Sequence, residues 1–446
     1  MKSVVVVGGG VAAKGFLSAG LALHKDVKFT FIRNCEKSPV PCGIPYALGT
    51  LENPYDNTSS DQGLINKGVD LIIDEVVDVD VESKLVKLAE GNDVAYDKLV
   101  MATGAMPFVP PFPGKDLKNI EVIVKDSDVV KAQKDKIMAA KNIVVVGGGF
   151  IGVEIADEIT KLGGKNITIV ELARNILSAA FDVKYCEESE ELLRNKGIKV
   201  LTKVGVTEFK GNEKVEKVIL ADGTELDADY VLLSIGVKAN VDLGLKMGLN
   251  GDGRSGIIID AYQQTSNPDV LAIGDCASKV DLITGKPSGI KLASIAAREG
   301  RVAAANIFSK TMVTDPKGVT SLFSTSIDGV YFGATGMTHE QLVRENIEHE
   351  VVELSTIDRH PEALPDASEM IGSFMFAKEN GKLLGCQIKG ANQVAEAINF
   401  LGYALQQDAT AQDLFVLNYA SHPMGTASPN KYLAHMAATE MLKRMR

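Results

Sequence analysis

Two glycine-rich turns, in residues 3–13 and 142–154, constrain the fold of this 446-residue chain most strongly. Each turn follows a short apolar run and precedes a helical pattern, and the first reads Gly8-x-Gly10-x-x-Ala13. Glycine at positions 8 and 10 lets the turn tighten and lets the backbone approach a pyrophosphate, while Ala13 permits close packing of helix on strand. The pattern predicts a βαβ unit that binds a dinucleotide.

The second turn reads Gly147-x-Gly149-x-x-Gly152 and is again placed between strand and helix. Its partner strand, residues 166–170, is followed by Glu171, 24 residues after Gly147. At this spacing a carboxylate accepts both hydroxyls of the adenosine ribose and repels a 2′-phosphate. Two such units predict two bound dinucleotides, and Glu171 predicts that the second is NADH rather than NADPH.

Three other segments are suited to contact the first dinucleotide. The second strand of the first unit lacks an acid at the expected position, so Glu36 either reaches the ribose from farther along or is a solvated surface residue. The pair Thr103-Gly104 ends another strand and brings backbone close to a cofactor. Gly274-Asp275 also follows an apolar strand, which places a carboxylate beside the hydroxyls or phosphates of a cofactor.

A lone cysteine, Cys42, lies in the stretch Ser38-Pro39-Val40-Pro41-Cys42-Gly43-Ile44-Pro45-Tyr46. A thiol before Gly and Pro suits the start of a helix, where free N–H groups and the helix dipole lower the pKa of the thiol. The alternative is a buried cysteine that acts as a small hydrophobic residue. Because the five cysteines (Cys35, Cys42, Cys186, Cys276 and Cys386) contain no CxxC pair, neither a disulfide framework nor a metal site is expected.

The charge balance limits the partners of the chain. The net charge is −11 and no basic run offsets it, which argues against a nucleic-acid surface or an anionic membrane surface. No window approaches the roughly 18 apolar residues that span a bilayer, and the first residues enter an apolar strand without a basic leader. We therefore expect a cytoplasmic protein whose partners are small molecules or a second copy of itself.

The length of the chain suits roughly three domains. The proline-rich stretch 107–114 and a return crossing at 236–240 flank the second nucleotide unit, and 256–260 is a further predicted strand. From about residue 319 the pattern changes to strands and helices without a Gly-rich turn, as in an α+β domain. The predicted fold class is α/β, with two Rossmann-like dinucleotide-binding domains and a C-terminal α+β domain.

The whole chain resembles the FAD-dependent pyridine nucleotide-disulfide oxidoreductases in the order of its motifs: the two Gly-rich turns, Ala102-Thr103-Gly104, Gly274-Asp275 and the α+β domain. The resemblance implies a homodimer of three-domain subunits that use FAD and NADH. It implies an FAD-binding domain at 1–114 and 242–310, an inserted NAD-binding domain at 115–241, and a dimerisation domain at 319–446.

The resemblance also carries site residues over to this chain. It implies FAD on Gly8, Gly10, Ala13, Thr103, Gly104 and Asp275, with Glu36 as a further candidate, and NADH on Gly147, Gly149, Gly152 and Glu171. Phe150 matches the aromatic residue that covers the flavin until nicotinamide displaces it. Glu154 matches the helix glutamate beside flavin and nicotinamide, or else is a carboxylate on a helix face.

The Cys42 stretch resembles the single-cysteine branch of this family. Position 37 is a lysine, whereas members with a redox-active disulfide carry a second cysteine there. The stretch is similar to the motif of coenzyme A disulfide reductases and persulfide reductases, although Pro39 and Pro41 replace a Phe and an Asn. The matching residues are Ser38, Cys42, Gly43, Pro45 and Tyr46. The resemblance implies that Cys42 reduces a small disulfide, persulfide or polysulfide, such as coenzyme A disulfide.

Two other functions stay open. NADH oxidases and peroxidases share the Cys-Gly pair, and in them the cysteine cycles through sulfenic acid while oxygen or peroxide is reduced. A flavoprotein that serves as a redox-responsive binding partner would instead leave Cys42 idle. Cys35 is either a resolving thiol for Cys42 or a strand-end residue; Cys276 is expected to pack beside FAD, and Cys186 and Cys386 to be structural.

Near the C-terminus, residues 418–423 lie where the family lends residues to the active site of the partner subunit. Tyr419 matches a tyrosine of the coenzyme A disulfide reductases, and its phenol could hydrogen-bond to or protonate a departing thiolate. His422 could supply the proton near neutral pH. The alternatives are a packed interface tyrosine and a capping histidine. The other histidines lie in polar surroundings without the spacing of a site and are expected at the surface, with His360 a candidate at the interface.

Overall fold

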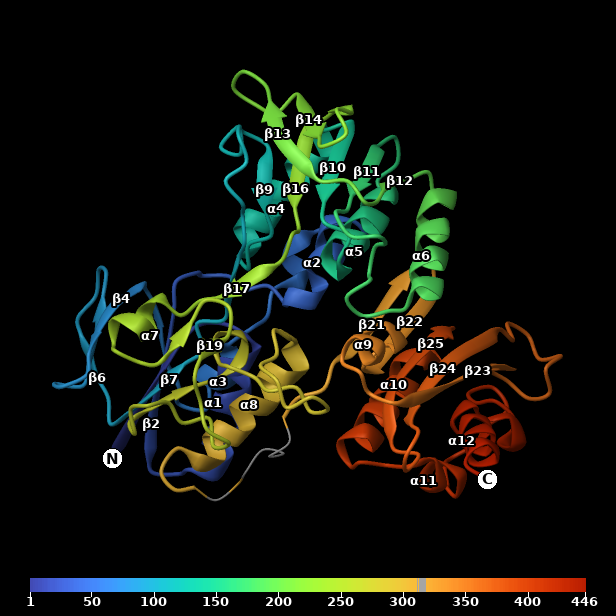
Figure 1. The fold of residues 1–446 in the computed structure, drawn as a ribbon. Coiled ribbons are helices and arrows are strands. Elements are labelled where there is room, and N and C mark those ends of the chain that lie inside the picture. The colour runs from blue at the N-terminus through green and yellow to red at the C-terminus, as the bar shows by residue number, and fades with distance from the viewer. Residues whose placement is uncertain (311, 313–317) are drawn as a thin grey trace.

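The first apolar run forms β1 (Lys2–Val7), the central strand of a parallel sheet in the computed structural model, which describes residues 1–310, 312 and 318–446 (Figure 1). Val4 and Val6 face two helices, while Val5 and Val7 face a small antiparallel sheet, because successive strand side chains alternate. The helices are α1 (Val11–Leu23) and α8 (Ala293–Asn306), and the small sheet is β4 (Val76–Asp80), β5 (Leu85–Leu88) and β6 (Val94–Ala95).

The strand order of this first sheet is β20-β7-β1-β2-β3. Its other strands are β2 (Val27–Arg33), β3 (Asp70–Ile73), β7 (Lys98–Met101) and β20 (Val270–Ala272). β20 follows the second nucleotide unit in the chain, so the first sheet is built from segments on both sides of that unit.

The second apolar run forms β10 (Asn142–Val146) in a parallel sheet of order β12-β11-β10-β16-β9. Its buried strands are rich in Val and Ile, as expected where both faces are covered. The other strands are β9 (Ile120–Val122), β11 (Asn166–Val170), β12 (Lys199–Leu201) and β16 (Tyr230–Leu233). One face packs on α4 (Ser127–Ala139), α5 (Phe150–Thr160) and α6 (Val183–Asn195), and the other on β13 (Val206–Lys210), β14 (Lys217–Leu220) and β15 (Glu225–Asp227).

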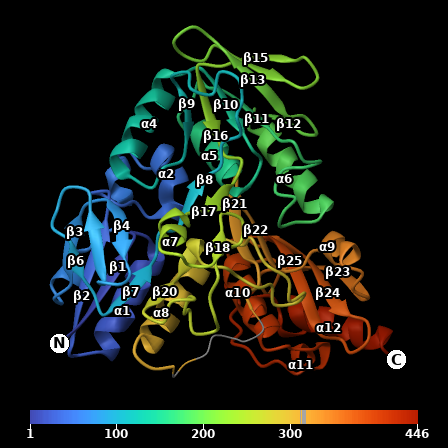
Figure 2. The same ribbon diagram turned by 60° about the vertical axis from the view of Figure 1, so that its left-hand side comes forward.

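Short segments connect these two parts of the molecule (Figure 2). β8 (Ala105–Pro107) pairs antiparallel with β17 (Val237–Ala239), where the sequence predicts an outward and a return crossing. α2 (Ile44–Leu48) leaves the first part and buries Ile44, Ala47 and Leu48 in the core beneath α5. The remaining short elements here are η1 (Pro41–Gly43), η2 (Pro54–Asn57), α3 (Gln62–Ile65), α7 (Asp242–Lys246), β18 (Gly251–Asp252), β19 (Gly256–Ile257) and η3 (Gly274–Cys276).

The C-terminal residues form an antiparallel sheet of order β21-β22-β25-β24-β23. Its strands are β21 (Leu322–Ile327), β22 (Val330–Gly336), β23 (His349–Ile357), β24 (Glu369–Ala377) and β25 (Leu383–Gly390). The accompanying helices are α9 (His339–Arg344), α10 (Gln393–Gln406), α11 (Ala411–Phe415), η4 (Pro429–Lys431) and α12 (Leu433–Arg444). α10 and α12 pack on this sheet through a shared apolar core, as in the α+β domain that the sequence predicts.

One predicted strand is wrong in its extent. The run 256–260 is paired only at β19, because the chain turns at Asp260, whose carboxylate accepts hydrogen bonds from Tyr262 N and Gln264 N. Within the described ranges, the helices include none with the length and apolar character needed to cross a bilayer.

Candidate functional site

Cys42 lies in η1, immediately before α2, in a loop that a neighbouring asparagine holds in place. A Cβ atom at Gly43 would lie 2.0 Å from Asn57 Oδ1, so the residue after the cysteine has to be glycine while Asn57 keeps its position. Asn57 Nδ2 donates to Val40 O at 3.0 Å, and Val40 N donates to Asn57 O at 2.8 Å. These contacts fix the backbone on which the thiol is carried.

The two prolines of this loop have structural roles. Pro39 forms a bridge with Thr58, and Pro41 occupies the first position of η1, where the missing N–H costs no hydrogen bond. The Thr58 hydroxyl in turn pairs with Ser127 Oγ at 3.0 Å, at the start of α4. The cysteine loop is therefore tied to the second nucleotide unit as well as to the first.

The Cys42 side chain is exposed, yet its surroundings raise the pKa of its thiol. Neighbouring protein atoms displace part of the hydration of the sulfur, and the negative charge of Glu154 acts in the same direction, while the Lys125 ammonium acts against both. The helix-start argument predicts a lowered pKa, and that prediction is wrong. α2 is only five residues long, and Cys42 precedes it in a 3₁₀ turn, so the dipole is too weak to offset desolvation.

The other cysteines are less accessible. Cys186, Cys276 and Cys386 are buried, and burial raises the pKa of each thiol, in Cys186 to about 12. Cys35 is half-buried, with its sulfur 3.8 Å from the carbonyl oxygen of Lys125. Of the five cysteines, all of which lie within the described residues, Cys42 is the one that is exposed.

The first Gly-rich turn has a shape that fits the pyrophosphate of FAD. Gly8 has φ +122°, and a Cβ there would lie 2.1 Å from Ala102 O, so the turn packs directly on the end of β7. A Cβ at Gly10 would meet nothing within 4 Å, and no side chain caps α1, whose buried Ala13 allows close packing. The first N–H groups of α1 therefore face open space in which they can bind an anion.

Thr103 and Gly274 lie close to the same turn and to the start of α1. Thr103 Oγ1 donates to Asn240 O at 2.7 Å, and Gly104 takes φ +72° beside it. Asp275, in η3, has its carboxylate 3.8 Å from Lys125 Nζ. Glu36 is exposed, which leaves both predicted roles open to it, a contact with the ribose or a place on the surface.

A buried ion pair holds η3 in place. Lys279 and Glu299 lie 3.3 Å apart with their side chains 2% exposed. Lys279 Nζ also donates to Gly274 O at 2.7 Å, and Gly274 N donates to Glu299 at 2.7 Å. The N–H and the carbonyl group of Gly274, the residue before Asp275, are thus both held by hydrogen bonds to the ion pair.

The second Gly-rich turn repeats the geometry of the first. A Cβ at Gly147 would lie 2.3 Å from Ser234 O, and one at Gly152 would lie 2.1 Å from Gly147 O, whereas Gly149 faces open space at the start of α5. Glu171 accepts backbone hydrogen bonds from Gly148 N and Ala173 N, both at 2.6 Å. Each carboxylate oxygen keeps a further lone pair, so Glu171 is held in a position from which it can accept ribose hydroxyls.

Phe150 and Glu154 lie on the first turns of α5 and contact β21 of the C-terminal sheet. Burial raises the pKa of the Glu154 carboxyl. The Glu154 charge also contributes to raising the pKa of Tyr46, a phenol on α2 next to Cys42 that the sequence analysis did not assign to the site. The sequence signal for Tyr46 is that it lies only four residues after Cys42 in the same stretch. The Glu154 charge therefore raises the pKa of both Cys42 and Tyr46.

Tyr419 and His422 are not brought to Cys42 within one chain. They lie between α11 and α12, whereas Cys42 precedes α2, which Figure 1 shows well apart from α11 and α12. The Tyr419 ring stacks on Tyr432, with centroids 4.0 Å apart, and its hydroxyl is buried without a hydrogen-bond partner among the described residues. The exposed His422 accepts a hydrogen bond at Nδ1 from Met424 N.

The remaining histidines are exposed or half-buried, and His339, His349 and His360 among them make contacts that their spacing does not indicate. His339 Nδ1 and His349 Nε2 lie 2.8 Å apart, across the loop that joins α9 to β23. His360 pairs through Nδ1 with Thr426 O at 2.9 Å, close to the Tyr419 segment. These contacts span gaps in the sequence that spacing alone does not reveal.

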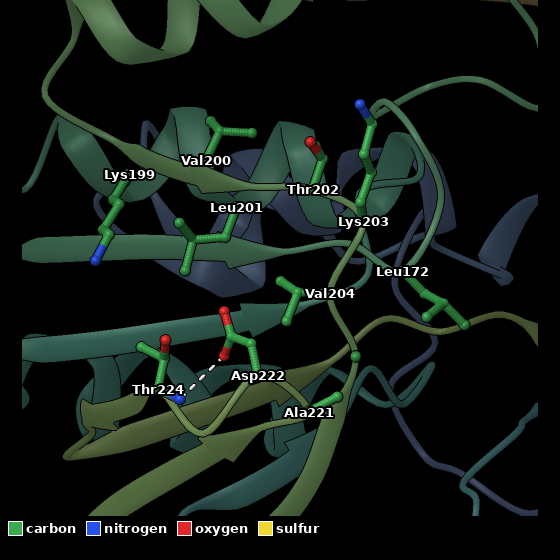
Figure 3. Close-up of a pocket in the computed structure, with 11 residues that line it drawn as sticks. Leu172, Lys199, Val200, Leu201, Thr202, Lys203, Val204, Ala221, Asp222 and Thr224 are labelled. Atoms are coloured by element: carbon green, nitrogen blue, oxygen red, sulfur yellow. Dashed lines mark hydrogen bonds between the residues drawn. The ribbon is translucent and has the colours of Figure 1, made fainter.

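An open pocket of about 610 Å³ lies beside the second unit, at the edge strand β12 (Figure 3). It is bounded by the loop 202–205 and by the turn at Asp222 between β14 and β15. Leu172 lines it, directly after Glu171, but the predicted site residues themselves do not.

The fold and these two nucleotide cradles define an enzyme of the NADH-dependent flavoprotein oxidoreductase class. Residues 2–300 match the family described as pyridine nucleotide-disulphide oxidoreductase, and residues 327–431 match the dimerisation domain of the same family. The chain belongs to the pyridine nucleotide-disulphide oxidoreductase family and uses FAD and NADH. This confirms the family that the order of motifs predicts.

The similar proteins carry the names of two kinds of enzyme, NADH oxidases and a polysulfide/persulfide reductase. The chain is 30% identical over 430 residues to an NADH oxidase of Methanocaldococcus jannaschii, covering 94% of each chain. It is 29% identical over 430 residues to an NAD(P)H coenzyme A polysulfide/persulfide reductase of Pyrococcus horikoshii, covering 95% of each. The solved structure of the water-forming NADH oxidase from Lactobacillus brevis, bound to NADH, superposes with a TM-score of 0.91 at 25% identity, covering 100% of this chain and 99% of that one.

Proposed function

We propose that this enzyme passes electrons from NADH through FAD to Cys42, which reduces a small disulfide, persulfide or polysulfide. The observation that carries the proposal is the exposure of Cys42 on a loop held by Asn57, while the other cysteines are buried or half-buried. An acceptor that forms a covalent adduct needs a sulfur that it can reach. The similarity to a coenzyme A polysulfide/persulfide reductase supports the same acceptor class.

In this proposal the chain positions both cofactors around Cys42. The Gly8 turn and Asp275 hold FAD, and the Gly147 turn and Glu171 hold NADH, with Phe150 and Glu154 at the nicotinamide end. FAD held there would supply a relay for two electrons from NADH to the cysteine sulfur.

The chemistry of the chain itself takes place at Cys42 Sγ. The thiolate attacks one sulfur of the acceptor, which forms a mixed disulfide and releases the first thiolate. Two electrons then cleave the mixed disulfide, which restores the Cys42 thiolate and frees the second thiol. The balance is NADH, a proton and one disulfide to NAD⁺ and two thiols, or thiol and hydrogen sulfide from a persulfide. Lys125 favours the thiolate that begins the cycle.

We propose further that two chains form the working unit, in the cytoplasm. The match to a dimerisation domain supports a homodimer. In such a dimer Tyr419 and His422 of one subunit would lie at the Cys42 site of the other, and the unpartnered Tyr419 hydroxyl supports a role in binding. The five unpaired cysteines support a reducing compartment.

The second candidate is an NADH oxidase or peroxidase. The similarities to two NADH oxidases favour it. In this case Cys42 would be oxidised to a sulfenic acid by peroxide, and two electrons with two protons would return it to the thiol and release water.

Anaerobic stopped-flow spectroscopy separates the two candidates. The NADH-reduced enzyme is mixed in turn with coenzyme A disulfide, polysulfide, glutathione persulfide, peroxide and oxygen. We expect fast reoxidation by a sulfur acceptor in the native enzyme and in Cys35→Ser, and loss of that reaction in Cys42→Ser. Fast reoxidation by oxygen or peroxide alone, abolished in Cys42→Ser, would establish the oxidase instead. Full turnover of the disulfide, polysulfide or persulfide by Cys42→Ser would leave Cys42 without a role.

A further inference from the structure

The first strand of the C-terminal sheet, β21, reaches across to the helix that follows the second Gly-rich turn. Thr325 Oγ1 donates to Glu154 Oε1 at 2.7 Å. Two residues earlier, the Phe323 ring stacks on the Phe150 ring, with centroids 5.0 Å apart and an interplanar angle of 24°. Thr325 is buried, and Phe323 and Glu154 are half-buried.

The spacing of these four residues makes the two contacts a single interface. Phe150 and Glu154 are four residues apart on α5, so they share one face of that helix. Phe323 and Thr325 are two residues apart on β21, so they share one face of that strand. The stacked rings of Phe150 and Phe323 set the distance between α5 and β21. At this distance the Thr325 hydroxyl can reach the Glu154 carboxylate.

We propose that Thr325 is a positioning residue of the nicotinamide site: its hydroxyl holds the Glu154 carboxylate, charged and oriented, while the Phe323–Phe150 stack holds strand and helix at the distance this needs. The inference rests on the placement of Glu154 at the nicotinamide end in the proposed function. It assigns to the C-terminal sheet a part in nucleotide binding in addition to subunit assembly.

The charges around Glu154 explain why it needs a donor. Burial raises the pKa of its carboxyl, and the nearby carboxylates Glu158 and Asp157 of the same helix add to the rise, whereas the Thr325 hydrogen bond lowers it. On η1 and α2, the groups whose pKa values respond to the Glu154 charge are the Cys42 thiol and the Tyr46 phenol, neither of which supplies positive charge. Thr325 is therefore the group on β21 that favours the ionised form.

The ionised form matters because the nicotinamide ring of NAD⁺ is positively charged. A carboxylate beside that ring stabilises the oxidised nucleotide, and a protonated carboxyl does not. Below the pKa of Glu154 the enzyme should therefore bind NAD⁺ more weakly. Removal of the Thr325 hydroxyl raises that pKa, so the weakening should begin at a higher pH.

Calorimetric titration of the oxidised, FAD-loaded enzyme with NAD⁺ across a pH series tests this without turnover. The variant Thr325→Val keeps the shape of the side chain and removes the donor, and Thr325→Ser keeps the donor. We expect the midpoint of the affinity loss to move to higher pH in Thr325→Val and to stay in place in Thr325→Ser. Because hydrogen bonds to charged groups are strong, NAD⁺ should bind Thr325→Val about tenfold more weakly at pH values where the Glu154 carboxyl is ionised in the native enzyme but protonated in the variant.

Glu154→Gln supplies the second arm of the experiment. It should bind NAD⁺ with little pH dependence, and adding Thr325→Val to it should change nothing further. The exposed Ser324→Ala on the opposite face of β21 is the packing control and should match the native enzyme.

An unchanged pH profile in Thr325→Val, or the same loss in Thr325→Ser, would overturn the proposal. A native profile in Glu154→Gln would overturn the placement of Glu154 itself. None of these outcomes depends on the electron acceptor, so failure of the sulfur-reductase proposal is distinguished from failure of this one.

Discussion

Gly43→Ala should loosen the loop that carries Cys42, for a steric reason that can be worked out from the structure. Gly43 has φ −90° and ψ −5°, which alanine adopts without strain. The added Cβ, however, would lie 2.0 Å from Asn57 Oδ1. Asn57 must retreat by about 1 Å or more before ordinary contact returns. That retreat breaks its hydrogen bond to Val40 O.

Loss of that hydrogen bond costs about 1 kcal/mol, and the overpacking adds about 1–3 kcal/mol. Because a large cofactor-binding protein does not unfold in two states, the cost is best measured locally, by native-state hydrogen exchange followed by mass spectrometry. Even the smallest total, about 2 kcal/mol, speeds exchange about 30-fold in peptides covering residues 38–59. Peptides from β23 and β24 should not change.

Two further variants make the test specific. Asn57→Ala removes the obstructing amide, so Gly43→Ala should cost much less in that background than in the native chain. Gly63→Ala is the matched control, since a Cβ there would meet nothing within 4 Å, and it should exchange as the native enzyme does. Equal costs of Gly43→Ala in both backgrounds, or native exchange in the single variant, would refute the reasoning.

The remaining predictions concern charge. Lys125→Met removes the ammonium that favours the Cys42 thiolate, so the pKa of the thiol should rise and the pH midpoint of its alkylation by iodoacetamide should move upward; a downward move would contradict this. Glu171→Ala removes the acceptor for Gly148 N and Ala173 N, and should weaken NADH binding by about tenfold or more while narrowing the preference over NADPH, measured by calorimetry. Lys279→Met leaves the buried Glu299 carboxylate without its partner, at a cost of about 3–5 kcal/mol, and should speed the loss of FAD on dilution. The double variant Lys279→Met with Glu299→Gln should retain FAD better. Equal loss in both variants would contradict the role of the ion pair.

Local patterns predicted much of the fold. The Gly-rich turns were visible because strand, turn and helix are contiguous in the sequence. The change of pattern predicted from about residue 319 agrees with β21, the first strand of the C-terminal sheet, which begins at Leu322. α4 was missed because its residues are mostly polar, although Asp126 gave a signal: its carboxylate caps the helix by accepting from Asp128 N and Val129 N.

The electrostatics of the candidate site depended on distant parts of the chain. The sequence predicts a lowered pKa for Cys42, whereas the folded chain raises it, because the desolvating neighbours and the charge of Glu154 act on the thiol only after folding. The contact between Glu154 and Thr325 joins residues 171 positions apart, which no periodicity reveals. The requirement for Gly43 likewise depends on Asn57, which belongs to another turn.

The most direct test of the central claim is to trap the adduct on Cys42. The oxidised enzyme is mixed anaerobically with coenzyme A disulfide or a persulfide, quenched in acid, digested and mapped by mass spectrometry, with and without a later addition of NADH. A mixed disulfide on the Cys42 peptide that disappears when NADH is added is the predicted result. An adduct on Cys35 instead, or none on Cys42 while the acceptor is still reduced, would contradict the account.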